Sequence, residues 1–314
     1  MSTNKAISVI IVTYNSEKHI YDCLDSLFKY NDINDALEVI IVDNQSDNFA
    51  NTKISLEEKY ADKLVIVEND RNGGYGQGNN VGIRISSAPI ILIMNPDVRL
   101  VMPIFQEAIK AFKNPDVVEF GMRQLNKEMK TGYSYDIVPQ ISPLLRKTLM
   151  KICNKFQIFN QNYMYLMGAC FFINKAAFFE IGMFDERIFM YGEEEDIHYR
   201  FKKKKDSIIQ YNKNLCYAHL HGLYSTSSNN NCIANKMAFK NKLMIYGERG
   251  LQRKNIIKSE IHGVKLSLIK LQIEILLFRD EKKKSQINDL KVWLKELDEM
   301  LNHIHQTNVD SIIC

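Results

Sequence analysis

The chain has 314 residues, of which 46% are hydrophobic and 25% charged, and its formal net charge is +4. These values are typical of a globular enzyme with one large α/β core and a helical appendage. The small net charge gives no reason to expect nucleic-acid binding. No apolar run approaches the ~20 residues of a membrane-spanning helix, and the amino terminus lacks the features of a signal peptide. The six cysteines are Cys23, Cys153, Cys170, Cys216, Cys232 and Cys314. They show no paired metal-binding spacing, which predicts reduced thiols in a cytoplasmic protein.

The first part of the chain predicts strands that alternate with helices. Residues 6–12 (AISVIIV) form a β-branched apolar run, and residues 17–30 carry apolar side chains at helical spacing. Two further short apolar runs, at 37–42 and 64–67, predict the second and third strands. Strands and helices in this alternation imply a parallel sheet with right-handed crossovers.

A glycine-rich segment, Asn69–Asn80 (NDRNGGYGQGNN), is predicted to be a loop before a helix at 81–87. It fits neither G-x-G-x-x-G nor the P-loop pattern, so a dinucleotide site is not expected. The apolar strand that follows ends at Asn95-Pro96-Asp97. Because Pro96 cannot continue a ladder, Asp97 is expected at the carboxyl end of an interior strand, where open α/β sheets bind ligands. Alone, Asn-Pro-Asp is equally compatible with a plain turn.

Acidic and histidine residues recur in the second half of the chain. A strand is predicted over 163–173, and a short strand over 215–218 leads to His219. The cluster Glu193–Asp196 begins a helix that runs to about Lys204. Acids in a first turn are also favoured by the helix dipole alone, so a capping role stays open. Arg200, four residues after Asp196, predicts an intrahelical ion pair.

Two amphipathic regions lie outside these motifs. Residues 140–159 combine basic and apolar side chains, which indicates either a helix on a membrane surface or a buried helix with a solvated basic side. Apolar residues at spacings of three and four in 257–278 and 290–304 predict a helical hairpin or a dimer-forming coiled coil. A second apolar stripe on the first of these helices consists of Leu266, Ile269, Ile273 and Leu276. This stripe favours a homodimer contact, with membrane docking as the rival interpretation.

Taken in order, eight segments of the chain resemble the motifs of inverting family 2 glycosyltransferases, and in particular the branch that contains many bacterial rhamnosyltransferases. The segments are IIVTYN (10–15), VDNQS (42–46), NGGYGQGNN (72–80), NPD (95–97), GMFDE (182–186), FMY (189–191), EEEDI (193–197) and HLHG (219–222). The resemblance covers about residues 6–225.

The resemblance implies a GT-A fold, in which helices flank a mostly parallel twisted sheet. The implied domain is 1–232, with a nucleotide-binding half (about 1–121) and an acceptor half (about 122–232). Outside the resemblance, the apolar spacing predicts a C-terminal helical hairpin within 233–314, as an oligomerisation or membrane-docking element. The implied activity moves a sugar from dTDP-rhamnose or a UDP-hexose to a saccharide or lipid-linked saccharide in bacterial surface polysaccharide synthesis. Such an enzyme would be cytoplasmic or peripheral at the inner face of the cell membrane.

The resemblance also assigns site residues by position. Asp97 and His219 would bind Mg²⁺ or Mn²⁺, with His221 a weaker candidate. Glu194 would be the general base, assisted by Glu193 and Asp196. Donor-sugar and acceptor contacts fall on Gly168, Ala169 and Asp185. The nucleotide contacts, among which Asp43 would accept the imide N–H of uracil or thymine, are Thr13, Tyr14, Asn15, Asp43, Asn72, Gly74, Asn79 and Asn95.

The chain departs from the family pattern at two of these positions. Asn95 replaces the first acid of Asp-x-Asp, and Glu194 stands where the family has an aspartate. Two other function classes fit the sequence less well. A sugar nucleotidyltransferase usually carries a glycine-rich basic loop after its first strand, but residues 13–16 contain no glycine. A non-catalytic nucleotide-sugar-binding protein would not need both a metal-site acid and a base.

Overall fold

The computed structural model describes residues 4–138, 143–220, 228–250, 252–278 and 283–307. His221, the weaker metal candidate, lies outside these ranges. The chain forms two compact units, one of residues 1–138 and 150–223 and one of residues 139–149 and 224–314. The helix α5 (Pro143–Phe156) contributes residues to both units.

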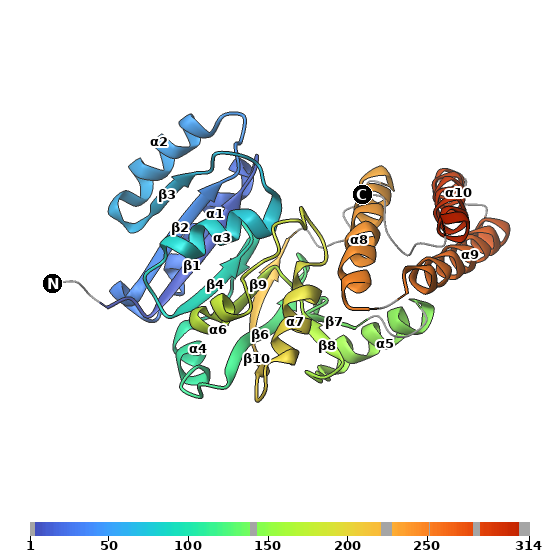
Figure 1. Ribbon diagram of the computed structural model, residues 1–314. Helices are drawn as coiled ribbons and strands as arrows, with labels where there is room; N and C mark the ends of the chain where they lie inside the picture. Colours follow the sequence, from blue (N-terminus) through green and yellow to red (C-terminus); the bar gives the residue numbers. More distant parts are fainter. Residues whose placement is uncertain (1–3, 139–142, 221–227, 251, 279–282, 308–314) are drawn as a thin grey trace. The chain divides into compact units, whose positions relative to one another are not determined.

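The first unit is built on an eight-stranded sheet with the strand order β3-β2-β1-β4-β9-β6-β10-β5 (Figure 1). The four strands from β3 to β4 are parallel, as expected, and β6 is parallel to β10. β9 runs antiparallel between β4 and β6, and β5 runs antiparallel to β10. A small second sheet pairs β7 with β8. The strands are β1 (Ile7–Thr13), β2 (Leu37–Asp43), β3 (Val65–Glu68), β4 (Ile90–Met94), β5 (Val98–Leu100), β6 (Val117–Leu125), β7 (Tyr135–Ile137), β8 (Met164–Leu166), β9 (Cys170–Asn174) and β10 (Ile208–His219).

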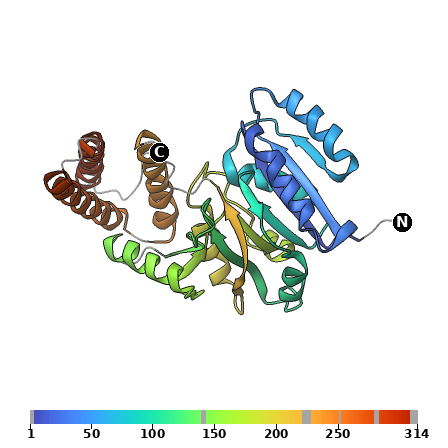
Figure 2. The same cartoon turned by 180° about the vertical axis from the view of Figure 1, so that it is seen from behind.

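Helices cover both faces of this sheet. Figure 1 shows α3 in front of the parallel strands, and the reverse view in Figure 2 shows α1 on their other face. The helices of the first unit are α1 (Glu17–Lys29), α2 (Phe49–Tyr60), α3 (Gly74–Ile85), α4 (Phe105–Ala111), the second half of α5, α6 (Lys175–Glu180) and α7 (Glu193–Lys203), with short 3₁₀ turns at Asn34–Ala36 and Ala61–Lys63.

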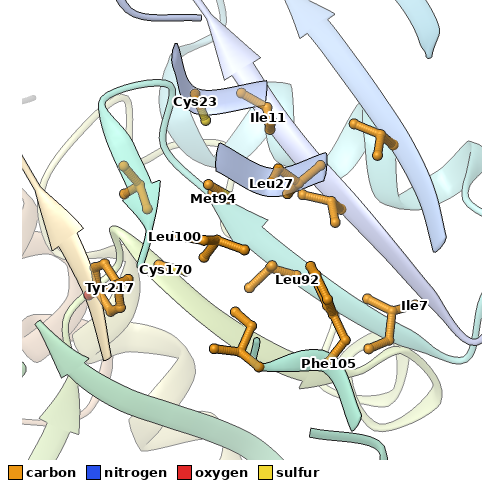
Figure 3. Packing of buried hydrophobic residues seen from close by; sticks show 14 of the residues in the cluster. Ile7, Ile11, Cys23, Leu27, Leu92, Met94, Leu100, Phe105, Cys170 and Tyr217 are labelled. Atoms are coloured by element: carbon orange, nitrogen blue, oxygen red, sulfur yellow. The ribbon is translucent and has the colours of Figure 1, made fainter. Parts of the chain in front are cut away.

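The hydrophobic core lies between the sheet and α1, α2 and α4. Figure 3 shows Ile7 and Ile11 of β1 and Leu92 of β4 packed beside Leu27 of α1 and Phe105 of α4, all fully buried. The buried side of α1 follows the apolar spacing of its sequence. Because each such side chain contributes about 1.5–3 kcal/mol when buried, the core fixes the strands against which the polar loops are arranged.

The helix α3 begins at Gly74, so the expectation of a loop to Asn80 and a helix from Val81 was wrong. The glycines act in packing rather than as loop formers. A Cβ at Gly78 would lie 2.8 Å from Val12 Cγ1, and one at Gly82 would lie 2.6 Å from Ile10 Cγ2. The helix can therefore lie against β1 only because these positions have no side chain.

Two strand predictions were also wrong in their extent. The segment 163–173 forms two strands in different sheets, β8 and β9, rather than one. β10 has 12 residues instead of the short run 215–218, and its register against β6 shifts between Asn212 and Cys216. This bulge interrupts the pairing, and the polar side chains before it hid the strand from the hydrophobic pattern.

The second unit contains the predicted helical hairpin, preceded by α8, which the sequence did not predict. Its helices are α8 (Ser228–Glu248), α9 (Arg253–Phe278) and α10 (Lys283–Thr307), and α9 packs along α10. The first apolar stripe is buried, with Ile257 1% and Leu297 0% exposed, whereas Ile269 and Ile273 of the second stripe are each 52% exposed. A subunit contact through this stripe stays a prediction.

One buried carboxyl group in the central sheet gives a testable prediction. Glu119 of β6 is 1% exposed, and its Oε2 has no hydrogen-bond partner among the described residues. Burial is the main cause that raises the pKa of Glu119 from 4.5 to about 8, and repulsion from Glu194 is a smaller cause. The folded state therefore holds this proton more tightly than the unfolded state, and the associated stability is complete below pH 4.5 and lost as the pH rises through about 8.

Glu119→Gln keeps the shape of the neutral acid, so we expect it to be more stable than the wild type by about 3 kcal/mol at pH 7, with little difference at pH 4.5. Urea unfolding at several pH values measures the difference. Glu128→Gln, at an exposed turn, is the control and should leave the wild-type pH dependence unchanged. Parallel stability curves for the wild type and Glu119→Gln would contradict the assignment.

Candidate active site

The loops after β1 and β2 are joined by polar side chains at the sheet edge. Thr13 and Asp43 are register partners, and the Thr13 hydroxyl donates to Asp43 Oδ1 at 3.0 Å. Ser46 donates to the same carboxylate through its hydroxyl (2.6 Å) and its backbone N–H (2.9 Å). Asp43 is thus only 2% exposed, whereas Tyr14 is 52% exposed. The backbone N–H of Asn15 donates to Ser46 Oγ at 2.8 Å, which holds the two loops together.

A network of buried amides, missed by sequence reasoning, fixes the start of α3. Asn69 Nδ2 donates to Asn44 Oδ1 at 2.9 Å and to Gln77 Oε1 at 2.6 Å. Asn44 Nδ2 in turn donates to the carbonyl of Gly74 at 2.9 Å. The available signal was a run of amides around two strand ends and a glycine-rich segment. These bonds satisfy polar groups that burial would otherwise leave costly.

The first turn of α3 contacts the segment that precedes the acid cluster. Gly74 has φ +86°, and a Cβ there would overlap the carbonyl of Phe189, so only glycine fits. The N–H of Tyr75 donates to that carbonyl at 2.9 Å, and the Tyr75 hydroxyl donates to the carbonyl of Gly168 at 2.5 Å. Asn72 Oδ1 accepts a hydrogen bond from the Gly74 N–H at 3.2 Å.

Asn79 occupies a different environment from the other predicted nucleotide contacts. It is 1% exposed, and its amide donates to the Tyr75 carbonyl of its own helix at 2.9 Å. Its Oδ1 is buried and has no hydrogen-bond partner among the described residues. A nucleotide contact at Asn79 stays a prediction.

Asp97 and His219 are adjacent, although they are distant in sequence. Asp97 lies in the turn between β4 and β5, and His219 is the last residue of β10, in register with Val98. His219 Nε2 is 3.2 Å from Asp97 Oδ2, and the side chains are 12% and 16% exposed. The Leu220 N–H donates to the Asp97 carbonyl at 3.1 Å. Antiparallel pairing of β5 with β10 creates this pair.

A carboxylate oxygen and an imidazole nitrogen are suitable donors for Mn²⁺ or Mg²⁺. Within the described ranges, however, no three His, Cys, Asp or Glu side chains are grouped as a metal site. The residues present therefore fit a cation only if most of its ligands come from water and from a bound phosphate.

The acid cluster forms the first turn of α7, after Gly192 with φ +111°. Glu193 is 2% exposed, and Glu194 keeps part of its surface exposed. The Glu194 carboxylate lies so close to Gly168 that a Cβ there would overlap it. Burial raises the pKa of Glu194, and hydrogen bonds from the N–H groups of Glu194 and Gly168 offset part of that rise. Burial and repulsion from Glu194 raise the pKa of Glu193 well above its usual range.

Asp196 of this cluster and Asp185, which precedes it in sequence, are each paired with an arginine. The predicted pair between Asp196 and Arg200 is confirmed, since Arg200 Nε donates to Asp196 Oδ2 at 2.8 Å and its Nη2 is 2.5 Å from the same oxygen. Arg187 binds Asp185 with Nε at 2.9 Å from Oδ1 and Nη2 at 2.6 Å from Oδ2, and this pairing lowers the pKa of Asp185. Glu194 has no such arginine among the ion pairs of the described residues.

Gly168 and Ala169 connect the acid cluster to the end of β4. The carbonyl of Ala169 accepts a hydrogen bond from the Asn95 N–H at 2.9 Å, two residues before Asp97. The preceding residue, Gly168, donates to Glu194 and accepts from Tyr75. The break between β8 and β9 thereby brings residues from both halves of the sequence to one edge of the sheet.

Comparison with known proteins identifies relatives that transfer sugars. A family model described as glycosyl transferase family 2 matches residues 8–182. The low-salt glycan biosynthesis hexosyltransferase Agl10 of Haloferax volcanii is 27% identical over 214 residues, which are 65% of this chain and 64% of that protein. The poly(ribitol-phosphate) β-N-acetylglucosaminyltransferase TarS of Staphylococcus aureus is 33% identical over 93 residues, 29% of this chain and 16% of that protein. The chain thus spans less than two thirds of the length of either relative.

Solved structures with similar folds are distant in sequence. The mannosyltransferase PcManGT from Pyrobaculum calidifontis, in complex with GDP-Man and Mn²⁺, has a TM-score of 0.56 at 13% identity, over 96% of this chain and 88% of that one. S. aureus TarS has a TM-score of 0.53 at 17% identity, over 82% of this chain and 42% of that one. These likenesses concern the fold, which is of the expected GT-A type. Because the family model covers more than half of the sequence, the chain belongs to glycosyltransferase family 2.

Proposed function

We propose that the protein is an inverting glycosyltransferase that moves a sugar from a nucleoside-diphosphate sugar to a saccharide or lipid-linked saccharide acceptor. The observation that carries the proposal is the junction at Gly168 and Ala169. Gly168 holds the Glu194 carboxylate, and Ala169 is bonded to Asn95, two residues before Asp97. Glu194, the candidate base for the acceptor hydroxyl, and Asp97, the candidate metal ligand at the diphosphate, are therefore connected through adjacent peptide units.

Glu194 is the proposed general base. Its raised pKa gives it a proton affinity suited to taking a hydroxyl proton, and its partial exposure leaves it accessible, unlike Glu193. In a single displacement, the acceptor oxygen forms a bond to the anomeric carbon while its proton passes to Glu194. The bond to the nucleoside diphosphate breaks, and the leaving group keeps the electron pair. Glu193 and Asp196 support the turn that positions the base.

Glu194→Gln should therefore bind the donor as the wild type does. Its turnover should fall by roughly a hundredfold or more, which is the scale of a lost general base. Turnover is measured as nucleoside diphosphate released from the nucleotide-sugar that the wild type uses, and donor affinity by calorimetry. Because the pKa of Glu194 is raised, wild-type turnover should fall as the pH drops through that pKa.

Glu193→Gln is the matched control for this variant and should retain far more activity. If Glu193→Gln is inactive and Glu194→Gln is active, the base is the other glutamate. If both variants turn over normally, the proposed carboxylate base is wrong.

Asp97 and His219 are the proposed protein ligands of a divalent cation, Mg²⁺ or Mn²⁺. The support is the 3.2 Å approach of a carboxylate to an imidazole beside the Asn95 turn, together with the Mn²⁺ present in the PcManGT structure. A bound cation would supply charge neutralisation for the departing diphosphate. Asp97 and His219 would hold that charge in place.

Asp97→Ala should abolish transfer, and EDTA should do the same to the wild type. Calorimetry with MnCl₂ and UDP should show metal-dependent nucleotide binding in the wild type and its loss in Asp97→Ala. Asp22→Ala, an exposed aspartate on α1, serves as the control and should change neither property. Full wild-type activity in metal-free buffer would overturn the proposal.

The donor is proposed to carry thymine or uracil, with dTDP-rhamnose ahead of UDP-hexoses. Asp43 and Thr13 support an imide base because they meet at the strand ends, and the exposed ring of Tyr14 is available for stacking. Rhamnose rests on the sequence resemblance alone. The remaining proposed contacts are Asn15, Asn72, Gly74 and Asn95 for the nucleotide and Gly168, Ala169 and Asp185 for the donor sugar or acceptor.

Calorimetry against four nucleoside diphosphates tests the base preference. UDP and dTDP should bind more tightly than GDP and CDP, because neither GDP nor CDP presents a pyrimidine imide to Asp43. Tyr14→Ala should weaken UDP binding, while Tyr163→Ala, another exposed tyrosine, should not. Tighter binding of GDP or CDP than of both UDP and dTDP would refute the assignment.

A further inference from the structure

The orientation of α5 is fixed by the side of the helix that carries Asn154. Asn154 is 2% exposed, its Oδ1 accepts a hydrogen bond from the Ser134 N–H at 2.7 Å, and its Nδ2 donates to the Tyr135 carbonyl at 3.0 Å. The Tyr135 hydroxyl donates to the carbonyl of Cys153 at 2.8 Å, and Met150 is 8% exposed. Rotating the helix about its axis would break these buried hydrogen bonds, so its opposite side is held outward.

That outward side is apolar. Leu145, Leu149, Ile152 and Phe156 are 51%, 36%, 45% and 64% exposed, and Ile158 beyond the helix is 54% exposed. The helical residues follow one another at spacings of four, three and four, so they form one stripe along α5. A helix that served only as packing would turn this stripe inward. The structure instead buries the side that carries Asn154. This contradicts the alternative in which α5 buries its apolar side and leaves only its basic side in solvent.

The charges on α5 are all positive. The helix carries Arg146, Lys147, Lys151 and Lys155, and no acid occurs between Asp136 and Glu180. At 100° per residue, Arg146 lies on one flank of the apolar stripe and Lys155 on the other, with Lys151 farther round the helix on the same side as Lys155. Long basic side chains on both flanks of an apolar stripe can reach lipid phosphates while their stems cover apolar surface. No helix in the described ranges is long and apolar enough to cross a bilayer.

We propose that α5 docks the protein on a membrane surface rich in anionic lipid. The helix axis lies parallel to the surface, the apolar stripe enters the boundary between headgroups and acyl chains, and the flanking cations meet lipid phosphates. A purely apolar partner surface would offer no acidic groups to Lys151 and Lys155, whereas lipid phosphates would, which favours the lipid surface. This inference does not depend on the proposed glycosyl transfer.

Co-sedimentation of the full chain with vesicles tests the proposal without any donor or acceptor. The wild type should bind vesicles of phosphatidylcholine and phosphatidylglycerol, should bind pure phosphatidylcholine at least tenfold more weakly, and should be released by salt. The double variant Ile152→Ser with Phe156→Ser should bind these anionic vesicles at least tenfold more weakly than the wild type does. Lys151→Gln/Lys155→Gln should lose roughly thirtyfold, the scale for two cations near an anionic surface.

Ile54→Ser is the matched control, because Ile54 on α2 is 54% exposed and lies outside the proposed surface. It should bind as the wild type does, and circular dichroism should show all variants folded. Equal binding to neutral and anionic vesicles, or none to either, would overturn the proposal. So would a stripe variant that keeps vesicle binding but changes the oligomeric state in light scattering, since the stripe would then be a protein contact.

Discussion

The candidate site depends on the close contact between the Glu194 carboxylate and the backbone of Gly168. Any side chain at position 168 would overlap that carboxylate, and the Gly168 N–H donates a hydrogen bond to it. The contact exists because the chain leaves β8 after Leu166 and enters β9 at Cys170, so that the peptide units between are free to bind other groups. The break therefore joins the first turn of α7 to the end of β4 through Gly168 and Ala169.

The same region concentrates negative charge where water is largely excluded. Asp185 and Asp196 are paired with Arg187 and Arg200, whereas repulsion from Glu194 and Asp196 adds to burial in raising the pKa of Glu193. Burial favours the neutral forms of Glu193 and Glu194, and backbone N–H groups at the start of α7 favour the charged forms. Perturbed carboxyl groups of this kind are typical of sites that carry out acid–base chemistry.

Glycines act in this protein mainly by allowing close approach. The α3 helix rests on β1 through Gly78 and Gly82, and Gly74 admits the carbonyl of Phe189. The buried amides of Asn44, Asn69 and Gln77 then hold the start of this helix at the end of β2. Packing and polar satisfaction therefore act together, since a side chain at these glycines would separate the helix from the amides that fix it.

The sequence by itself determined the alternating strands and helices before residue 70, the acid-rich start of α7, the hairpin of α9 and α10, and the membership of the family. These features are local, because they rest on hydrophobic periodicity, capping and ordered motifs. Only the tertiary structure decided where α3 begins, how 163–173 divides between two sheets, and that Asp97 meets His219. It also showed that Asn79 is buried and that the apolar side of α5 faces outward. Those outcomes depend on contacts between residues distant in sequence, where a buried hydrogen bond or a missing Cβ outweighs local preference.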